Sequence, residues 1–285
     1  MIKYLHRLSK ASGKDPISDV DISGYTNLHI CSWHGTIEAA NYVLSVYGSN
    51  TARRRALLRA DRKGHLAPHI AAARGHIDIL KEMRKLSIDL IELRDSNGCT
   101  PWLFAAQRGQ IKTLRWLWSC CKNDTKSRCR LLLSKDRWDQ NALHLAAMHD
   151  CPSVVKLISN ELCRERDDMT MMNEEILNMP NVFGMNSLHV AAAKNRLAVL
   201  CALLKAGARV DEEDSGGSTA LFYASERGHV GCVAELIRSG ASRDKRSKHG
   251  LTPLDVACSE RLDDMLPYLC PEAVLVGDDN GGGVK

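Results

Sequence analysis

The chain has 285 residues, and its 39 lysines and arginines exceed its 34 aspartates and glutamates, which gives a formal net charge of +5. This small excess is weak evidence for a nucleic-acid-binding protein. The eleven cysteines are odd in number and form no Cys-x-x-Cys pair, which favours reduced thiols inside the cell over a disulfide framework. No apolar run of about 18 residues is present, so no membrane insertion is predicted.

The first 20 residues open with MIKYLHRLSK, whose charged side chains leave no room for the apolar core of a signal peptide. We expect residues 1–20 to form a cap or a short leader helix. The expected compartment is the cytoplasm, with the nucleus as the alternative.

From residue 21 onward the same short motif recurs seven times. Its copies are anchored at Gly24, Gly64, Gly98, Asp139, Gly184, Gly217 and Gly250. The steps between these anchors are 40, 34, 41, 45, 33 and 33 residues, so the base period is 33 residues with three insertions. Such a period indicates a stack of repeats, in which each unit buries its apolar face on its neighbours.

Each copy predicts a turn followed by two helices. An Asp or Asn before the turn can bond its own backbone, and the glycine supplies the positive φ that the turn needs. Pro101 and Pro253 suit the first position of a helix. The N-caps are expected at Thr26, Thr100, Ser187, Thr219 and Thr252. Repeats therefore start near residues 21, 61, 95, 136, 181, 214 and 247, and the fold class is all-α.

The pattern D-x-x-G-x-T-P-L-H-x-A-A-x-x-G-H, followed by an apolar helix that ends in AGA or SGA, resembles the ankyrin repeat over residues 21–270. The second copy departs from it with LAPH, Asp150 replaces the usual glycine, and Asp255 replaces the histidine. The resemblance implies a solenoid of about seven helix–turn–helix repeats with β-turn fingers. It also implies that the motif histidines bridge backbone groups of adjacent repeats, so we expect architecture rather than catalysis at His29, His69, His144 and His189.

Three insertions, near residues 46–60, 119–135 and 159–180, fall between the second helix of one repeat and the next turn. Each ends in a pair of large apolar residues shortly before the next turn, so we interpret them as lengthened helices plus a short loop. They are either tolerated loop length or a built-up edge that contacts a partner.

The first insertion contains the most basic stretch of the chain, ARRRALLRADRK. Its cations are Arg53, Arg54, Arg55, Arg59, Arg62 and Lys63, against the single acid Asp61. A nuclear-import signal, a nucleic-acid patch and an acidic-partner site all fit such a run, as does a solvated helix face. Because no aromatic residue interleaves with these cations to stack bases, nucleic acid is not the expected partner.

A second row of cations recurs at the end of the first helix of each repeat. It comprises His34, Arg74, Arg108, His149, Lys194 and Arg227. Cations there complement the helix dipole by about 0.3–1 kcal/mol each, which is a sufficient structural reason for them. In an ankyrin-like stack the same row would line the concave side, so Arg74, Arg108 and His149 are candidate contacts for an acidic ligand.

The turns carry the remaining candidates. Trp138 and Phe183 occupy matching positions in successive turns, and Lys63 has that place in an earlier turn. Large apolar groups on an exposed turn are uncommon without a partner, and Trp and Arg are enriched in binding hot spots. The predicted partner contacts in the turns are Arg62, Lys63, Arg137, Trp138 and Phe183. Of the other tryptophans, Trp102 and Trp116 are expected to pack inside, and Trp118 to be partly exposed.

These features predict a non-enzymatic protein-interaction module, a scaffold or adaptor that binds one or more proteins through its finger and inner-helix surface. Phosphate-binding, nucleophile-elbow, kinase and zinc motifs are absent from the sequence. We therefore expect no catalytic residue, cofactor or metal, and a chain that is monomeric alone. The alternatives are the soluble ankyrin domain of a larger complex, such as a ligase adaptor or the cytosolic region of a channel, and a weakly basic nuclear regulatory factor. Residues 271–285 are expected to be a flexible tail.

Overall fold

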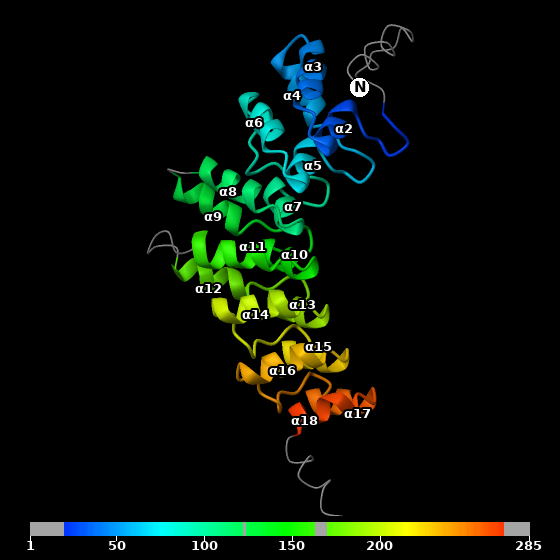
Figure 1. Cartoon of the computed structure of the whole chain (residues 1–285), viewed down its shortest axis with the longest axis vertical. Coiled ribbons are helices and arrows are strands. Elements are labelled where there is room, and N and C mark those ends of the chain that lie inside the picture. The colour runs from blue at the N-terminus through cyan, green and yellow to red at the C-terminus, as the bar shows by residue number, and fades with distance from the viewer. Residues whose placement is uncertain (1–19, 122–123, 163–169, 271–285) are drawn as a thin grey trace, which may run out of the picture. The chain divides into compact units, whose positions relative to one another are not determined.

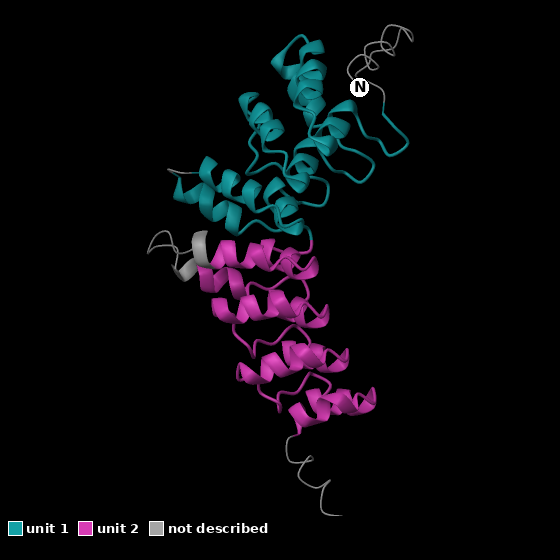
Figure 2. Cartoon of the chain, in the orientation of Figure 1, with its two compact units in different colours: residues 1–137 teal, residues 138–285 magenta. Residues whose placement is uncertain are grey.

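The structure is a computed structural model that describes residues 20–121, 124–162 and 170–270. Regular structure within these ranges is entirely helical, which confirms the all-α prediction. The chain divides into two compact units, residues 1–137 (unit 1) and residues 138–285 (unit 2), as Figure 2 shows. The expected tail, residues 271–285, and the expected leader up to residue 19 lie outside the described residues.

Unit 1 contains eight of the described helices. They are α2 (Asn27–His34), α3 (Ile37–Val46), α4 (Asn50–Leu57), α5 (Ala67–Arg74), α6 (Ile77–Lys85), α7 (Pro101–Gln107), α8 (Ile111–Cys120) and α9 (Thr125–Leu132). The first helices of successive repeats pack on each other, α2 on α5 and α5 on α7. The second helices form a separate row beside them, with α3 on α6 (Figure 1).

Unit 2 repeats this arrangement. Its helices are α10 (Ala142–Met148), α11 (Pro152–Lys156), the π-helix η1 (Leu157–Leu162), α12 (Thr170–Asn178), α13 (Ser187–Ala193), α14 (Leu197–Ala206), α15 (Ala220–Glu226), α16 (Val230–Arg238), α17 (Pro253–Ser259), the 3-10 helix η3 (Asp263–Met265) and α18 (Leu266–Leu269). One row runs α10, α13, α15, α17 and the other α11, α14, α16, α18, each helix packing on the next. Paired alanines such as Ala191 and Ala192, both fully buried, allow the first helices to approach closely.

Each turn before a first helix is built by its own acidic or amide side chain. In the turn of the fifth repeat, Asn181 Oδ1 accepts from the backbone N–H groups of Phe183 and Met185, at 2.9 and 3.1 Å. Successive turns are joined by single backbone hydrogen bonds, for example from Val182 N–H to the Trp138 carbonyl at 3.1 Å. These turns are the fingers that the resemblance implies.

The N-caps follow the prediction at the threonines, and one prediction is wrong by a residue. Asn186, not Ser187, caps α13, because its amide oxygen accepts from the backbone of Leu188 and His189. Ser187 is the first residue of that helix and is fully buried. In the second repeat Leu66 occupies the cap position and makes no side-chain cap.

The insertions do more than lengthen second helices. In the first and second insertions the chain leaves α3 and α8 and forms a separate third helix, α4 and α9. Their terminal apolar side chains are buried, Leu57 and Leu132 at 0 and 1% exposed. A straight extension would carry these leucines away from the core by about 1.5 Å per residue, so the chain must turn back. Only in the third insertion does the second helix continue, from α11 into η1, before α12.

Candidate functional site

The motif histidines lie inside the repeats and connect each repeat to the next. His144 Nε2 donates to the Met185 carbonyl at 2.9 Å, and His189 Nε2 to the Ser218 carbonyl at 3.1 Å. The other ring nitrogen of each lies 2.7 Å from the amide oxygen of the N-cap residue, Asn141 or Asn186.

Of the two motif histidines of unit 1, His29 follows the same plan in full and His69 only in part. His29 Nε2 bonds the His65 carbonyl at 3.1 Å, and its Nδ1 lies 2.7 Å from the hydroxyl of the cap Thr26. His69 Nε2 bonds the Cys99 carbonyl at 2.9 Å, but its Nδ1 has no partner among the described residues because Leu66 occupies the cap position.

Burial also makes these rings unsuitable as acid–base groups. It lowers the pKa of His29 and His189, and lowers the pKa of His69 to about 3. The rings of His29, His69, His144 and His189 are at most 1% exposed, so no substrate can reach them. The expected bridging role of the four histidines is confirmed.

Three of the predicted contacts meet in a groove of about 430 Å³ in unit 1. Lys63 comes from the second finger, and Arg74 and Arg108 from the ends of α5 and α7. These positions converge because the first helices of repeats 2 and 3 pack side by side, which aligns their C-terminal residues. No aspartate or glutamate lines the groove, so its lining charge is positive.

Aromatic side chains form the remaining walls of the groove. Trp33, at the end of α2, is 43% exposed, and the guanidinium carbon of Arg74 lies 3.5 Å from its ring centroid. Such a cation–π pair contributes about 0.5–2 kcal/mol and holds both side chains in one geometry. Tyr25 and Phe104 complete the aromatic lining.

A histidine held between two buried carboxylates shapes the finger side of the groove. His65 Nδ1 lies 3.5 Å from Asp61 Oδ2, and His65 Nε2 lies 4.0 Å from Asp95 Oδ2. The same carboxylates build the fingers, since Asp61 Oδ1 and Asp95 Oδ1 accept backbone N–H groups at 2.8 to 2.9 Å. Burial raises the pKa of Asp95. The position of His65 in the groove wall therefore depends on the carboxylates that also build the turns.

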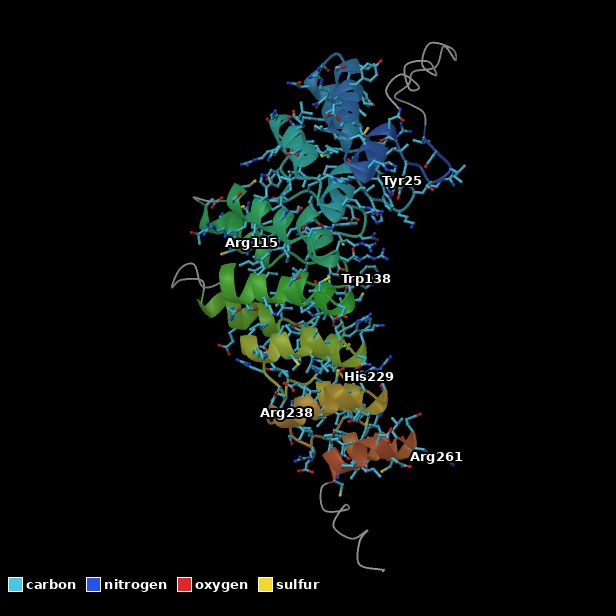
Figure 3. The ribbon with its side chains drawn as sticks, in the orientation of Figure 1. Tyr25, Arg115, Trp138, His229, Arg238 and Arg261 are labelled. Carbon is cyan, nitrogen blue, oxygen red and sulfur yellow. The ribbon has the colours of Figure 1, made fainter. Side chains whose placement is uncertain are left out.

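The predicted finger residues of unit 2 form a second surface. Trp138 is 40% exposed, Val182 50% and Phe183 60%. The backbone hydrogen bond between Val182 and Trp138 places these residues on neighbouring fingers. We call Trp138, Val182 and Phe183 the finger ridge. Trp138 lies on the side of unit 2 opposite Arg238 in the view of Figure 3.

The other predicted residues lie apart from both surfaces or at their margins. Arg62 is exposed on the second finger, where its backbone N–H donates to the Ser23 carbonyl at 3.0 Å. Arg137 is exposed at the end of unit 1, and its N–H donates to the Asn97 carbonyl at 2.8 Å. His149 is the exposed C-cap residue of α10 in unit 2. The basic patch of Arg53, Arg54, Arg55 and Arg59 lies on and just after α4.

The structure also tests the expectations about three other tryptophans. Trp102 is fully buried, as predicted, but Trp118 is only 4% exposed, so the expectation of partial exposure is wrong. Arg128 of α9 covers it, with the guanidinium carbon 4.7 Å from the ring centroid. Trp116 is half-buried.

The sequence analysis missed the aromatic walls of the groove. Trp33 immediately precedes the cation His34, at a place where later copies have Ala73, Gln107 and Ala193. Phe104 follows the residue at the histidine position of its copy, where the other copies have an aliphatic residue except for Tyr223 in the sixth. A comparison of the copies position by position would have shown both as unusually large for their places.

The described parts of the chain contain no helix long and apolar enough to cross a membrane. In those same parts, no group of three or more His, Cys, Asp or Glu side chains is arranged to hold a metal ion.

Comparison with known proteins decides the family. A family model for three copies of the ankyrin repeat matches residues 28–128, 117–214 and 188–279. The chain belongs to the ankyrin-repeat family. Ankyrin repeats are protein-interaction modules, and stacked repeats present extended surfaces for this purpose.

Two relatives and one solved structure are informative. A transient receptor potential cation channel subfamily A member 1 homolog of Caenorhabditis elegans is 28% identical over 221 residues, 76% of this chain and 16% of the relative. The B-cell lymphoma 3 protein homolog of Mus musculus is 31% identical over 160 residues, 47% of this chain and 36% of the relative. The crystal structure of the ankyrin repeat domain of Bcl-3, described as a unique member of the IkappaB protein family, matches with a TM-score of 0.63 and 26% identity, over 86% of this chain and 99% of that one. This ankyrin protein spans well under half the length of both curated relatives.

Proposed function

We propose that this ankyrin protein binds an acidic segment of a partner protein in the groove of unit 1. The observation that carries the proposal is the stacked pair of Trp33 and Arg74 in a groove without lining carboxylates. An exposed tryptophan fixed by an arginine is a preformed anchor, so little side-chain entropy is lost when a partner covers it. Arg74, Lys63 and Arg108 would meet the partner's carboxylates around that anchor.

The shape of the groove supports a peptide segment over a small-molecule substrate. Its volume, about 430 Å³, suits a few side chains, and it is lined by helix ends and a finger rather than enclosed by a core. The histidines that resemble a catalytic motif are buried in backbone hydrogen bonds. Our proposal therefore includes no catalysis and no cofactor.

The finger ridge of unit 2 is proposed as a second contact surface, which an extended partner would cover with apolar side chains. We further propose that the chain is monomeric alone and works in the cytoplasm or the nucleus. Light scattering of the purified chain and imaging of a tagged full-length protein test these two points. The relatives named above include a channel, so placement within a larger assembly stays an alternative.

The test is affinity capture with matched variants, followed by measurement of the captured partner's affinity. Trp33→Ala combined with Arg74→Gln should weaken binding by about tenfold or more, equivalent to about 1.4 kcal/mol. Arg115→Gln on α8 is the control, because Arg115 is exposed and lies on the opposite side of unit 1 from Tyr25 (Figure 3). Undiminished binding by the groove variant, with normal folding, would reject the groove as the binding site.

A further inference from the structure

A pocket of about 470 Å³ lies beside the first insertion, apart from the groove. One face of α4 and the segment before it supply most of its lining, namely Tyr47, Ser49, Thr51, Arg55 and Arg59. Thr26, the N-cap of α2, contributes to the other side. The insertion thus creates a site that a repeat without an insertion would lack.

The charge of this pocket is positive and uncompensated. Arg55 and Arg59 are four positions apart and exposed, and neither has an ion pair within the part of the chain that the structure describes. No aspartate or glutamate lines the pocket, and the nearest acid in sequence, Asp61, is buried in its finger turn. Two guanidinium groups are therefore available to an anion.

The neighbouring arginines are not equivalent to these two. Arg53 is held by its own segment, because its Nε donates to the Tyr47 carbonyl at 3.2 Å and its Nη1 to Asn50 Oδ1 at 3.4 Å. Arg54 is exposed but does not line the pocket. The basic stretch therefore divides into residues that line the pocket and residues that do not.

A hydroxyl donor adds to the two guanidinium groups. Ser49 Oγ accepts from the Ala52 N–H at 3.2 Å and lies 2.8 Å from Thr51 Oγ1. Only one hydroxyl hydrogen can occupy the space between two oxygens, so the hydrogen of the other hydroxyl is free to donate elsewhere. The pocket therefore combines two guanidinium groups, each with several N–H donors, with one neutral hydroxyl donor.

This donor set matches a phosphate monoester better than a carboxylate. A phosphate monoester has a charge of about −2 near neutral pH and three terminal oxygens, which two arginines and a hydroxyl can share. A carboxylate has one charge and two oxygens, and a single arginine satisfies it. Nucleic acid fits less well, since Tyr47 is the sole aromatic residue lining the pocket and offers no series of stacking platforms.

We propose that the α4 pocket binds the phosphate group of a phosphorylated serine or threonine on a partner protein. That the phosphate is attached to a protein rests on the proposed function. That the pocket binds phosphate is argued from its own residues. The groove and the α4 pocket would then contact different parts of a partner, one of them only after phosphorylation.

The experiment follows the arginine Nε–H signals by NMR while inorganic phosphate, and then O-phosphoserine, is added to the full chain at constant ionic strength and about pH 7.5. Saturable shifts are expected at Arg55 and Arg59. Arg55→Gln with Arg59→Gln should weaken binding of both probes by about tenfold. The control, Arg54→Gln with Arg62→Gln, removes the same charge from the same stretch and should leave the affinity within about twofold.

Equal losses in the two double variants, or shifts that rise without saturating, would overturn the proposal in favour of diffuse charge attraction. So would tighter binding of a single-stranded oligonucleotide or of anionic vesicles that depends on all four arginines alike. Trp33→Ala with Arg74→Gln should still bind phosphate, so failure of the groove and failure of the α4 pocket are separable. Thermal melting checks that every variant is folded.

Discussion

Units 1 and 2 are built from the same repeat but expose different parts of it. In unit 1 the first helices present Trp33, Phe104 and the cations Arg74 and Arg108 around a groove. In unit 2 the residues corresponding to Phe104 in repeats 4 and 5, Leu145 and Val190, are 6% exposed, and the two most exposed large apolar side chains of its described residues, Val182 and Phe183, are on a finger. The same repeat fold can thus present its exposed recognition residues either on the first helices or on the fingers.

The two units also differ in how completely they satisfy the motif histidines. In unit 2 Asn141 and Asn186 cap the helices and contact the rings of His144 and His189. In unit 1 the ring of His69 has one bonded nitrogen and one without a partner in the described residues. A buried polar atom without a partner costs about 1–3 kcal/mol. The second repeat bears this cost at its motif histidine, whereas in the fifth repeat the buried atom without a partner in the described residues is Nδ2 of the cap residue Asn186.

The largest predicted effect tests this difference directly. His189→Ala removes a ring bonded on both sides. The Asn186 N–H loses its acceptor and the Ser218 carbonyl keeps only the Asp214 N–H as a donor, so the substitution should lower the free energy of unfolding by about 1–3 kcal/mol. His69→Ala should cost about 1 kcal/mol less, because it also removes a nitrogen that has no partner. Urea denaturation measures both.

His249→Ala is the control, since His249 is exposed. Equal costs for the His189 and His69 substitutions would show that the missing cap has no energetic consequence. A loss at His189 no larger than that of the control would contradict the bridging role itself.

The next prediction concerns pH and applies to both units. Burial lowers the pKa of His69 from 6.5 to about 3, and lowers the pKa of His29 and His189. Between the folded and unfolded pKa values only the unfolded chain binds the proton, so stability is present above about pH 6.5 and is lost as the pH falls. Well below pH 6.5 and above its folded pKa of about 3, His69 contributes a slope of about 1.4 kcal/mol per pH unit, and His29 and His189 contribute slopes of the same sign.

Denaturation at a series of pH values between about 7 and 5 measures the slope. His69→Ala should reduce it by the contribution of one proton. A free energy of unfolding that stays constant across the window would contradict the assignment of these rings as buried and neutral.

Local motifs explain what could be predicted from the sequence. The turn, the cap and the histidine bridge each depend on a motif of residues a few positions apart. The roles of Asp61, Thr26 and His189 could therefore be predicted from the sequence. Exposure depends instead on side chains distant in sequence. Trp118 is covered by Arg128 of a separate helix, where a lengthened second helix and a short loop were expected, and Trp33 becomes an anchor only when Arg74 of the next repeat lies over it.

The insertions show the same limit. One leucine of each of the first two apolar pairs is buried, Leu57 and Leu132, whereas Leu58 is 40% exposed. The path of the insertions could not be predicted, because a reversed third helix and a lengthened second helix share one amphipathic pattern. Whether the third helix or the lengthened second helix forms depends on where the neighbouring repeats leave an apolar surface uncovered.

The finger ridge offers a prediction of intermediate size. Replacing Trp138 and Phe183 with alanine should weaken partner binding by about tenfold, or 1.4 kcal/mol, while the melting temperature changes little, since the two residues are 40 and 60% exposed. Leu197→Ala is the matched control, because Leu197 on α14 is an apolar residue of unit 2 that is 41% exposed. If the ridge variant binds normally and the groove variant does not, recognition is confined to unit 1.

The smallest predicted effect concerns the residue that ends the first helix of repeat 4. Asp150 has a φ of 59°, whereas the corresponding residues of unit 1 are glycines, with φ values of 73° at Gly35, 81° at Gly75 and 64° at Gly109. A side chain in this left-handed region costs about 1 kcal/mol, which glycine avoids, although glycine also loses more backbone entropy on folding. The two terms nearly offset, so Asp150→Gly should raise the free energy of unfolding by about 0.5 kcal/mol.

The matched change Gly75→Asp in unit 1 should lower the free energy of unfolding by more than about 0.5 kcal/mol, because a Cβ there would lie 2.6 Å from the Gln110 amide oxygen. Urea denaturation of the pair checks the sign of each change, and a destabilised Asp150→Gly variant would mean that the aspartate side chain stabilises this turn by more than its backbone strain costs.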